Sequence, residues 1–495
     1  MTERPTVSTT SGRLRGYAEG GVYGFRGVPY AAPPVGALRW QAARPHPGWD
    51  GVRDAAEYGP TAPQPWRPEG LPVIGPLVGS HGEPPFDEDC LTLNLWTPGV
   101  DDRRRPVLVW IHGGGFMTGS GNLPYYAGDR FASDGDIVAI SINYRLGPLG
   151  FLSGVGDANC WLSDQVAALQ WIVDNVAAFG GDPSRITLAG QSGGAFSIAA
   201  LAQHPEARSQ FQRGILQSPP LGLDLPGPQE AVARTRSLAR HLGHRDIQAL
   251  GDETWERLIL GAVAVLGEFA EFGEWSVPFY PVVDAATLPR PPIAALADAD
   301  ADLIIGWTRD EATFAFGTDP RHTEASRDEV TAWASKRHGR RAEALYDEYA
   351  AASGKVRPVD VLAQIVTDEL FRCGARRVVQ ERAARRPVYA YQFELASPML
   401  DGAIGATHCL ELPFTFANID RWASAPFIQG LEAGMVARVT DALHDAWIGF
   451  VRQHEPVSRG LPFWPAYRAD DAAIAVVGDD IRIVRDIAAP PVCAE

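Results

Sequence analysis

The chain has 495 residues, 45% hydrophobic and 21% charged, which are the proportions of an ordinary globular protein and exclude a disordered or fibrous one. Its formal net charge of −16 argues against nucleic acid or anionic membranes as partners, because neither can exchange counterions for a cationic patch. The five cysteines are widely spaced and form no Cys-x-x-Cys pair, so we expect neither a zinc site nor a disulfide framework.

Two features bear on location. The first residues contain no apolar segment of the length that a secretory signal needs. The longest apolar stretch, at 258–266, is about half of the roughly 20 residues that a membrane span needs. We therefore predict a soluble cytoplasmic protein.

In chain order, a Pro/Gly-rich segment at 60–85 predicts a surface loop, and short apolar strands then alternate with segments of helical periodicity. This alternation is typical of an α/β fold, with a large, mostly parallel sheet covered by helices on both faces. A helix is predicted at 163–179. The predicted strands are 91–96, 107–111, 137–142, 186–189, 215–217, 303–305 and 388–393.

Two long helical stretches interrupt this pattern. We predict insertions at about 226–280 and 325–383, above the edge of the sheet where α/β enzymes place their sites. No flexible linker divides the chain, so residues 1–495 are interpreted as a single domain.

The sequence Gly190-Gln191-Ser192-Gly193-Gly194 fits G-x-S-x-G, directly after a predicted strand and at the start of a helix. In this setting the serine lies on a tight turn, and the flanking glycines allow close approach of the backbone. The strand–turn–helix context, more than the five letters, predicts a nucleophile at Ser192.

A second glycine-rich motif, His112-Gly113-Gly114-Gly115-Phe116, follows the strand at 107–111. Such a loop presents backbone N–H groups, as stabilisation of a tetrahedral oxyanion requires. The alternative is a phosphate-binding turn, but no lysine completes a P-loop here. The two glycine motifs together follow the lipase and esterase pattern.

A nucleophilic serine needs a base that is oriented by a carboxylate, in the chain order Ser, Asp/Glu, His. Glu311 and Asp310 both follow a predicted strand, and spacing does not choose between them. His408, in a loop after the strand at 388–393, is the candidate base. The other four histidines of this part of the chain are predicted to lie at the surface: His322, His338, His444 and His454.

At this point the motifs resemble those of the type-B carboxylesterases, the family of cholinesterases and bacterial para-nitrobenzyl esterases. The resemblance covers nearly the whole chain and implies the α/β-hydrolase fold. The segments that carry it include FRGVPYAAPPVGALRW, EDCLTLNLWTP, WIHGGGF, NYRLGPLGFL, LSDQVAALQWIVDNVAAFGGDPSRITLAGQSGG, PVVDAATLP, TRDEA, THCLELPF and GLPFWPAY.

Carried over residue by residue, the resemblance implies Ser192 as nucleophile, Glu311 as triad acid and His408 as base, with no metal or cofactor. It also implies an oxyanion hole formed by the N–H groups of Gly114, Gly115 and Gly193, and two buried ion pairs, Arg39 with Glu88 and Arg145 with Asp164.

The sequence departs from the family pattern near the site. Gln191 replaces the glutamate that precedes the serine in cholinesterases, which removes a negative charge and weakens any case for cationic choline esters. Cys90 keeps the position of a family disulfide partner, but Ala62 stands where the other cysteine would be. Further departures that could reshape the pocket are Gly193, Ala312, Pro219 and Trp161.

We therefore predict a serine carboxylesterase that acts on a small-molecule ester, with an apolar pocket of Phe269, Phe272, Phe314 and Phe414. The alternative for each phenylalanine is packing of an insertion onto the sheet. Alternative functions are amide, carbamate or thioester cleavage or acyl transfer at the same site, and, more remotely, a non-catalytic interaction module. The sequence predicts neither the physiological ester nor the oligomeric state.

Overall fold

The computed structural model describes residues 4–66, 73, 83–275, 277–353, 357–485 and 487–494. The loop predicted at 60–85 lies largely outside these residues.

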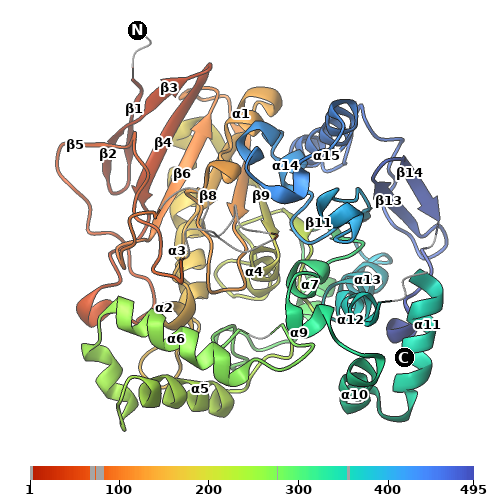
Figure 1. Ribbon diagram of the computed structural model, residues 1–495. Helices are drawn as coiled ribbons and strands as arrows, with labels where there is room; N and C mark the ends of the chain where they lie inside the picture. Colours follow the sequence, from red (N-terminus) through yellow and green to blue (C-terminus); the bar gives the residue numbers. More distant parts are fainter. Residues whose placement is uncertain are drawn as a thin grey trace.

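In this part of the chain, one eleven-stranded sheet runs through the molecule, which confirms the predicted α/β class (Figure 1). Its strand order is β14-β13-β12-β11-β10-β9-β7-β8-β6-β4-β3. The bounds are β3 (Tyr17–Glu19), β4 (Val22–Pro29), β6 (Thr92–Thr97), β7 (Arg105–Ile111), β8 (Val138–Ile142), β9 (Gly181–Gln191), β10 (Arg213–Gln217), β11 (Asp302–Thr308), β12 (Val388–Phe393), β13 (Ala473–Val477) and β14 (Ile481–Arg485).

The sheet is parallel in its centre and antiparallel at both edges. Strands from β8 through β7 and β9 to β13 pair in parallel, whereas β14 and the β6, β4 and β3 edge pair antiparallel. All seven strands predicted from the sequence are present. The sequence analysis missed the strands at both ends, including a small separate sheet of β1 (Thr6–Thr9), β2 (Gly12–Arg15) and β5 (Val52–Asp54).

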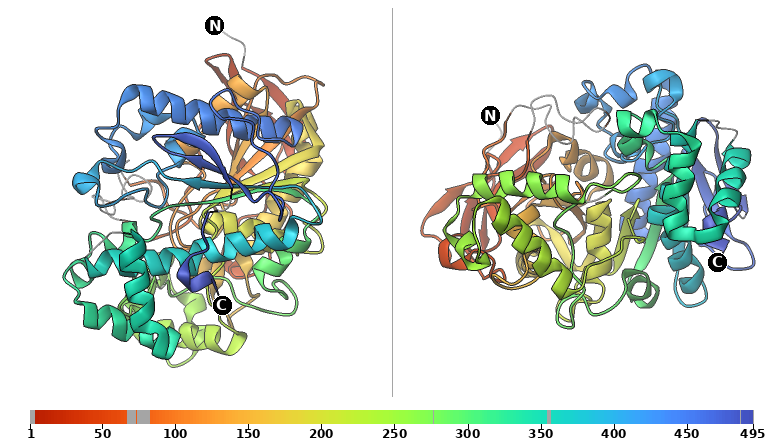
Figure 2. Two further views of the ribbon diagram at one scale, coloured as in Figure 1. Left: turned by 90° about the vertical axis from the view of Figure 1, so that its right-hand side faces the viewer. Right: turned by 60° about the horizontal axis from the view of Figure 1, so that its bottom comes forward.

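Alternate residues of the central strands face two different cores, since side chains of a strand point to opposite faces in turn. In β7, Val107 and Val109 belong to the core beneath α3 (Cys160–Asn175), α4 (Gly193–Leu201) and α13 (Cys373–Arg382). Trp110 belongs to the core beneath α1 (Asp129–Gly135) and α15 (Ala433–Gln453). Figure 2 shows these helices on both sides of the twisted sheet, as the sequence predicts.

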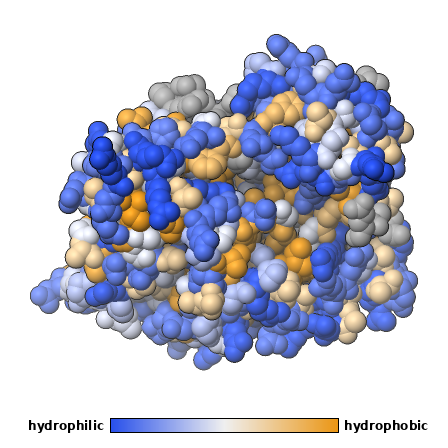
Figure 3. All heavy atoms as spheres, turned by 90° about the horizontal axis from the view of Figure 1, so that it is seen from below, coloured by the Kyte–Doolittle hydropathy of each residue, from blue (hydrophilic) through white to orange (hydrophobic). Residues whose placement is uncertain are grey.

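Helices also occupy both stretches for which insertions are predicted, and several lie along the lower edge of Figure 1. Figure 3 shows this side, where hydrophobic side chains gather around a hollow in the middle of a mostly hydrophilic face. The segment 325–383 was predicted to lie above the edge of the sheet, but its last helix, α13, does not. It packs against β11 and β12 in the layer that covers the sheet. The longer helices of these two stretches are α5 (Pro228–His241), α6 (Trp255–Phe269), α10 (Arg327–His338), α11 (Ala342–Ser353), α12 (Pro358–Thr367) and α13. The π-helical turn η7 (Asp368–Arg372) lies between the last two.

The chain has one disulfide bond, which the spacing of its cysteines did not lead us to expect. Cys373, at the start of α13, is bonded to Cys493 in the C-terminal turn η11 (Pro491–Ala494), with Cα atoms 5.4 Å apart. The two residues are 120 positions apart, so no local spacing pattern announces the pair. The remaining cysteines are free and buried: Cys90, Cys160 and Cys409.

Both ion pairs implied by the resemblance are present. Arg145 Nη2 lies 2.6 Å from Asp164 Oδ1, and both side chains are buried. Arg39 Nε lies 2.7 Å from Glu88 Oε2, at a position that water partly reaches. In the described ranges, no helix has the length and apolar composition needed to cross a membrane.

Candidate active site

Ser192 occupies the turn between β9 and α4, in the conformation φ 56°, ψ −124°. A non-glycine residue at positive φ is strained and persists only where its surroundings enforce it. A Cβ added at Gly194 would lie 2.0 Å from the Ile111 carbonyl oxygen, and one at Gly190 would lie 2.5 Å from the Gly194 carbonyl carbon. The G-x-S-x-G glycines are therefore required by close backbone contacts around a strained serine.

The glycine loop after β7 lies against this turn. Gly114 has φ +118° and Gly115 φ +60°, and a Cβ at Gly114 would lie 2.1 Å from the Thr118 carbonyl oxygen. Gly193 is the first residue of α4, so its N–H has no acceptor within the helix. These backbone groups are the predicted oxyanion donors, and Gly114 and Gly115 border the same cavity as Ser192.

His112, which opens the loop, supports the backbone. Its ring stacks on Tyr144 at 4.4 Å between centroids, and its Nδ1 lies 2.8 Å from the Gly113 carbonyl oxygen. Burial lowers the pKa of His112 to about 4, so the ring is neutral at physiological pH. A neutral ring here can donate to the Gly113 carbonyl without placing a charge beside the site.

The structure distinguishes the two candidate acids. Glu311 Oε2 lies 2.5 Å from His408 Nδ1, and both side chains are buried. The other oxygen, Oε1, accepts a hydrogen bond from the Thr308 N–H at 2.7 Å. The carboxylate of Glu311 thus reaches from the end of β11 to the histidine in the loop after β12.

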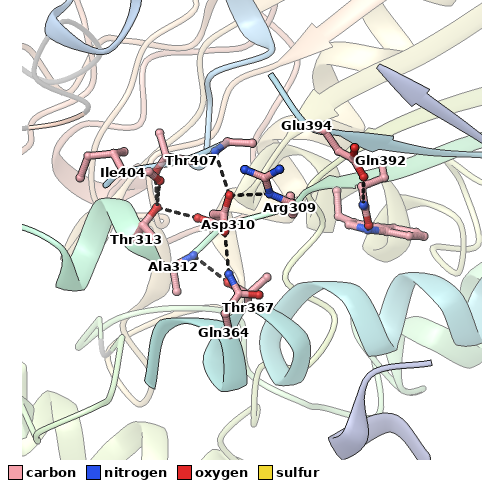
Figure 4. Close-up of polar contacts among 12 residues, drawn as sticks. Arg309, Asp310, Ala312, Thr313, Gln364, Thr367, Gln392, Glu394, Ile404 and Thr407 are labelled. Carbon is pink, nitrogen blue, oxygen red and sulfur yellow. Dashed lines mark hydrogen bonds and ion pairs between the residues drawn. The ribbon is translucent and has the colours of Figure 1, made fainter. Parts of the chain in front are cut away.

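Asp310 anchors the loop that carries the histidine, and Figure 4 shows its polar contacts. Its carboxylate accepts from Gln364 Nε2 at 2.7 Å, from the Ala406 N–H at 3.0 Å and from Arg309 Nε at 2.9 Å. The Asp310 N–H in turn donates to the Ala406 carbonyl at 3.0 Å. Asp310 therefore ties β11, α12 and the segment directly before His408 together.

The His408 imidazole lies among three aromatic rings. Phe314, Phe371 and Trp275 have centroids 5.2, 5.0 and 5.7 Å from that of the histidine. Phe314 is a predicted pocket residue. Phe371 was missed, because it lies on η7 within a helical stretch and no sequence pattern marks a π-helical turn.

Ser192 and His408 border one cavity of about 170 Å³, with a mainly apolar lining that includes Trp275, Val277 and Phe314. No hydrogen bond joins the Ser192 hydroxyl to His408 in the described part of the chain. His408 Nε2 instead lies 3.0 Å from Gln191 Nε2.

The other predicted pocket residues lie elsewhere. Phe269 borders a neighbouring cavity of about 200 Å³ that shares Trp275 and Val277 with the first. Phe272 stacks on His322 at 5.0 Å, in a separate cluster of the helical region. Phe414 is fully buried against Phe393. Phe414 therefore packs onto the sheet at β12, whereas Phe272 packs within the helical region.

Two of the four histidines predicted at the surface are in fact buried. His322 is 3% exposed and packs between Phe272 and Phe316. His444 is 4% exposed, with Nδ1 2.8 Å from the Thr415 carbonyl oxygen. Each lies on the inner face of its helix, which the sequence pattern around it did not reveal.

A second buried carboxyl group, Glu411, lies behind the histidine in the same loop. It accepts a hydrogen bond from Gln217 Nε2 at 3.2 Å and is fully buried. Burial, and then the nearby Glu311 carboxylate, raise the pKa of Glu411 to about 7. The described residues contain no group of three or more His, Cys, Asp or Glu side chains that could hold a metal ion.

The sheet topology, the strained serine turn and the Glu311–His408 pair define an α/β-hydrolase. A profile described as "Carboxylesterase family" matches residues 3–488. The chain belongs to this family and is a carboxylic-ester hydrolase.

Individual relatives agree over nearly their whole length. The chain is 61% identical to a phenmedipham hydrolase of Pseudarthrobacter oxydans, over 99% of this chain and 98% of the relative. It is 32% identical to the para-nitrobenzyl esterase of Bacillus subtilis, over 97% of this chain and 96% of the relative. Among solved structures, a carboxylesterase from Geobacillus stearothermophilus superposes with a TM-score of 0.85 at 35% identity, over 98% of each chain.

Proposed function

We propose that the chain hydrolyses small carboxylic esters, including aryl esters, through Ser192, His408 and Glu311 and an acyl-enzyme. The observation that carries the proposal is the convergence on one cavity of the strained serine, the glycine loop and a histidine held by a buried carboxylate. Each of these parts corresponds to one requirement of acyl transfer.

In this mechanism His408 takes the Ser192 proton as Oγ attacks the ester carbonyl carbon, and Glu311 stabilises the imidazolium that forms. The N–H groups of Gly114, Gly115 and Gly193 stabilise the oxyanion. Loss of one such donor costs on the order of 10²–10³ in rate. His408 then protonates the leaving alcohol, and water attacks the acyl-enzyme by the same route in reverse.

Carbamate hydrolysis is the second candidate activity. It is supported by the 61% identical relative, whose name describes hydrolysis of phenmedipham, a carbamate. The cavity is small and largely apolar, with Phe314 and Trp275 in its wall. Such a wall suits an aromatic group on either side of the scissile bond, whether the carbonyl belongs to an ester or a carbamate.

The first test is Ser192→Ala. We expect a folded protein in which the kcat for a nitrophenyl acyl ester falls by about 10⁶, as in serine hydrolases that lose the nucleophile. The measurement is steady-state hydrolysis, with circular dichroism as the check on folding. A folded variant with near wild-type turnover would refute the proposal.

Glu311→Gln and Asp310→Asn form a matched pair at neighbouring positions. Loss of the triad carboxylate should lower kcat by about 10⁴ at little cost in stability. Asp310→Asn should lower stability and leave most of the activity, because Asp310 holds the loop and not the imidazole. Equal losses of activity in the two folded variants would contradict this assignment.

A substrate panel separates the two candidate activities. Nitrophenyl acyl esters and the matching nitrophenyl carbamates, assayed side by side, give the ratio of kcat/KM for the two carbonyl types.

A further inference from the structure

The residue directly before the nucleophile has a contact that the mechanism above does not use. Gln191 is the last residue of β9, is 1% exposed and borders the catalytic cavity. Its amide Nε2 lies 3.0 Å from His408 Nε2. The amide therefore contacts the catalytic nitrogen of the proposed base.

The contact matters because the imidazole has only one hydrogen-bond acceptor. Nδ1 donates to Glu311, so a neutral imidazole has one lone pair left, on Nε2. The amide N–H of Gln191 is directed at this lone pair. The Ser192 hydroxyl needs the same lone pair when it attacks a carbonyl carbon. Gln191 and Ser192 are therefore alternative donors to one acceptor.

No other described side chain offers this contact. The charged or titratable groups that face the histidine are Glu311 on Nδ1, and Glu411 and Cys409 on its own loop. The remaining neighbours are the rings of Phe314, Phe371 and Trp275, which offer no lone pair or N–H within hydrogen-bond distance of Nε2 in the described residues.

We propose that Gln191 is a positioning residue that holds the His408 imidazole away from Ser192 in the free enzyme, and that substrate binding exchanges its hydrogen bond for one from the serine hydroxyl. This inference rests on the proposed function. The contact with Gln191 explains how Ser192 and His408 border one cavity without a hydrogen bond between them. The resting enzyme then keeps a weakly nucleophilic serine.

The test is Gln191→Met, which keeps the length of the side chain and removes the donor. Release of Nε2 should let Ser192 bond His408 in the free enzyme. We expect the second-order rate constant for labelling of Ser192 by an aryl fluorophosphonate to rise about fivefold, the factor that corresponds to a hydrogen bond of about 1 kcal/mol. In that reaction the Ser192 Oγ–P bond forms, fluoride leaves and the proton passes to His408.

Gln191→Glu supplies an independent readout. A carboxylate cannot donate to Nε2 and accepts from the imidazolium, so the acid limb of the kcat/KM profile should move upward by about one pH unit. Gln191→Met should move it less, because it adds no charge. A side chain with a purely structural role would lower activity without moving this limb.

The matched control is Gln165→Met. Gln165 is equally buried, on α3, and bonds Ser197 at 3.1 Å without contact to His408. Its labelling rate and pH profile should match those of the wild type.

The inference is overturned if folded Gln191→Met labels no faster than wild type. It is also overturned if folded Gln191→Glu keeps the wild-type acid limb, so either variant decides the matter alone. Failure of the proposed function is distinguishable, since it would appear as labelling or turnover that survives in Ser192→Ala.

Discussion

At the scale of single residues, the site depends on two adjacent carboxylates with different roles. Asp310 and Glu311 have the same chemistry and both follow β11, but the turn after that strand directs their side chains to different partners. Glu311 meets the imidazole of His408, whereas Asp310 bonds Gln364 and the backbone at Ala406. Spacing along the chain left this choice open, because it depends on where a distant loop lies.

Glu411 makes stability depend on pH in a direction that can be measured. Its pKa is about 7 in the folded protein, above the usual 4.5, so between these values the folded state holds a proton that the unfolded chain has released. Stability should therefore fall as pH rises through this window. In Glu411→Gln this contribution disappears. Relative to wild type, the variant should gain on the order of 2–3 kcal/mol between pH 5 and pH 8.

The measurement is urea denaturation of both proteins at the two pH values. The comparison cancels other titrating groups, which the two proteins share. An equal change in unfolding free energy in both would show that Glu411 is not the group responsible.

At the scale of secondary structure, the central elements are predictable because burial on both faces leaves an uninterrupted apolar signal. The strands β7, β8 and β11 show such runs, and the 3.6-residue period of α3 is equally clear. The π-helical turn η7 has no such signal. Its effect is nevertheless local to the site, since it places Phe371 against His408.

Asp164 on α3 tests how strongly that helix is tied to the segment after β8. It accepts from Arg145 Nε at 2.8 Å and Nη2 at 2.6 Å and from the Arg145 N–H at 3.0 Å, in a dry environment. Asp164→Asn leaves a buried guanidinium without its counterion. We expect a loss of about 3–5 kcal/mol in the free energy of unfolding.

Glu88→Gln is the comparison, because its pair with Arg39 is less deeply buried. The loss in the free energy of unfolding of Glu88→Gln, measured by urea titration, should be clearly smaller than that of Asp164→Asn. An Asp164→Asn protein as stable as wild type would contradict the assignment of this pair to structural support.

At the scale of the whole molecule, the main sheet and one disulfide bond connect parts of the chain that are far apart in sequence. Strand β3, near the N-terminus, and the C-terminal strand β14 form opposite edges of the same sheet. The bond between Cys373 and Cys493 attaches the last turn to α13, directly after the η7 turn that carries Phe371.

Removal of this bond should destabilise the protein measurably. Cys493→Ser removes a cross-link between residues 120 positions apart. A disulfide of this kind contributes about 2–4 kcal/mol to the free energy of unfolding. We expect a lower urea midpoint than in oxidised wild type, and the same decrease when wild type is reduced with dithiothreitol. The reductant should leave the variant unchanged. A variant as stable as the oxidised wild type would show that the bond contributes nothing.

The sequence by itself determined the α/β class, the central strands, the glycine motifs and the candidate nucleophile Ser192, because each of these leaves a local pattern in the chain. Periodicity reports burial, and glycines mark close backbone contacts at Gly190, Gly194 and Gly114.

Only the tertiary structure decided which carboxylate meets His408, which aromatic rings surround it, that Gln191 contacts its Nε2, and which cysteines pair. These are contacts between side chains that are distant in sequence. Their geometry depends on how layers pack around the sheet, and no local pattern of residues encodes that packing.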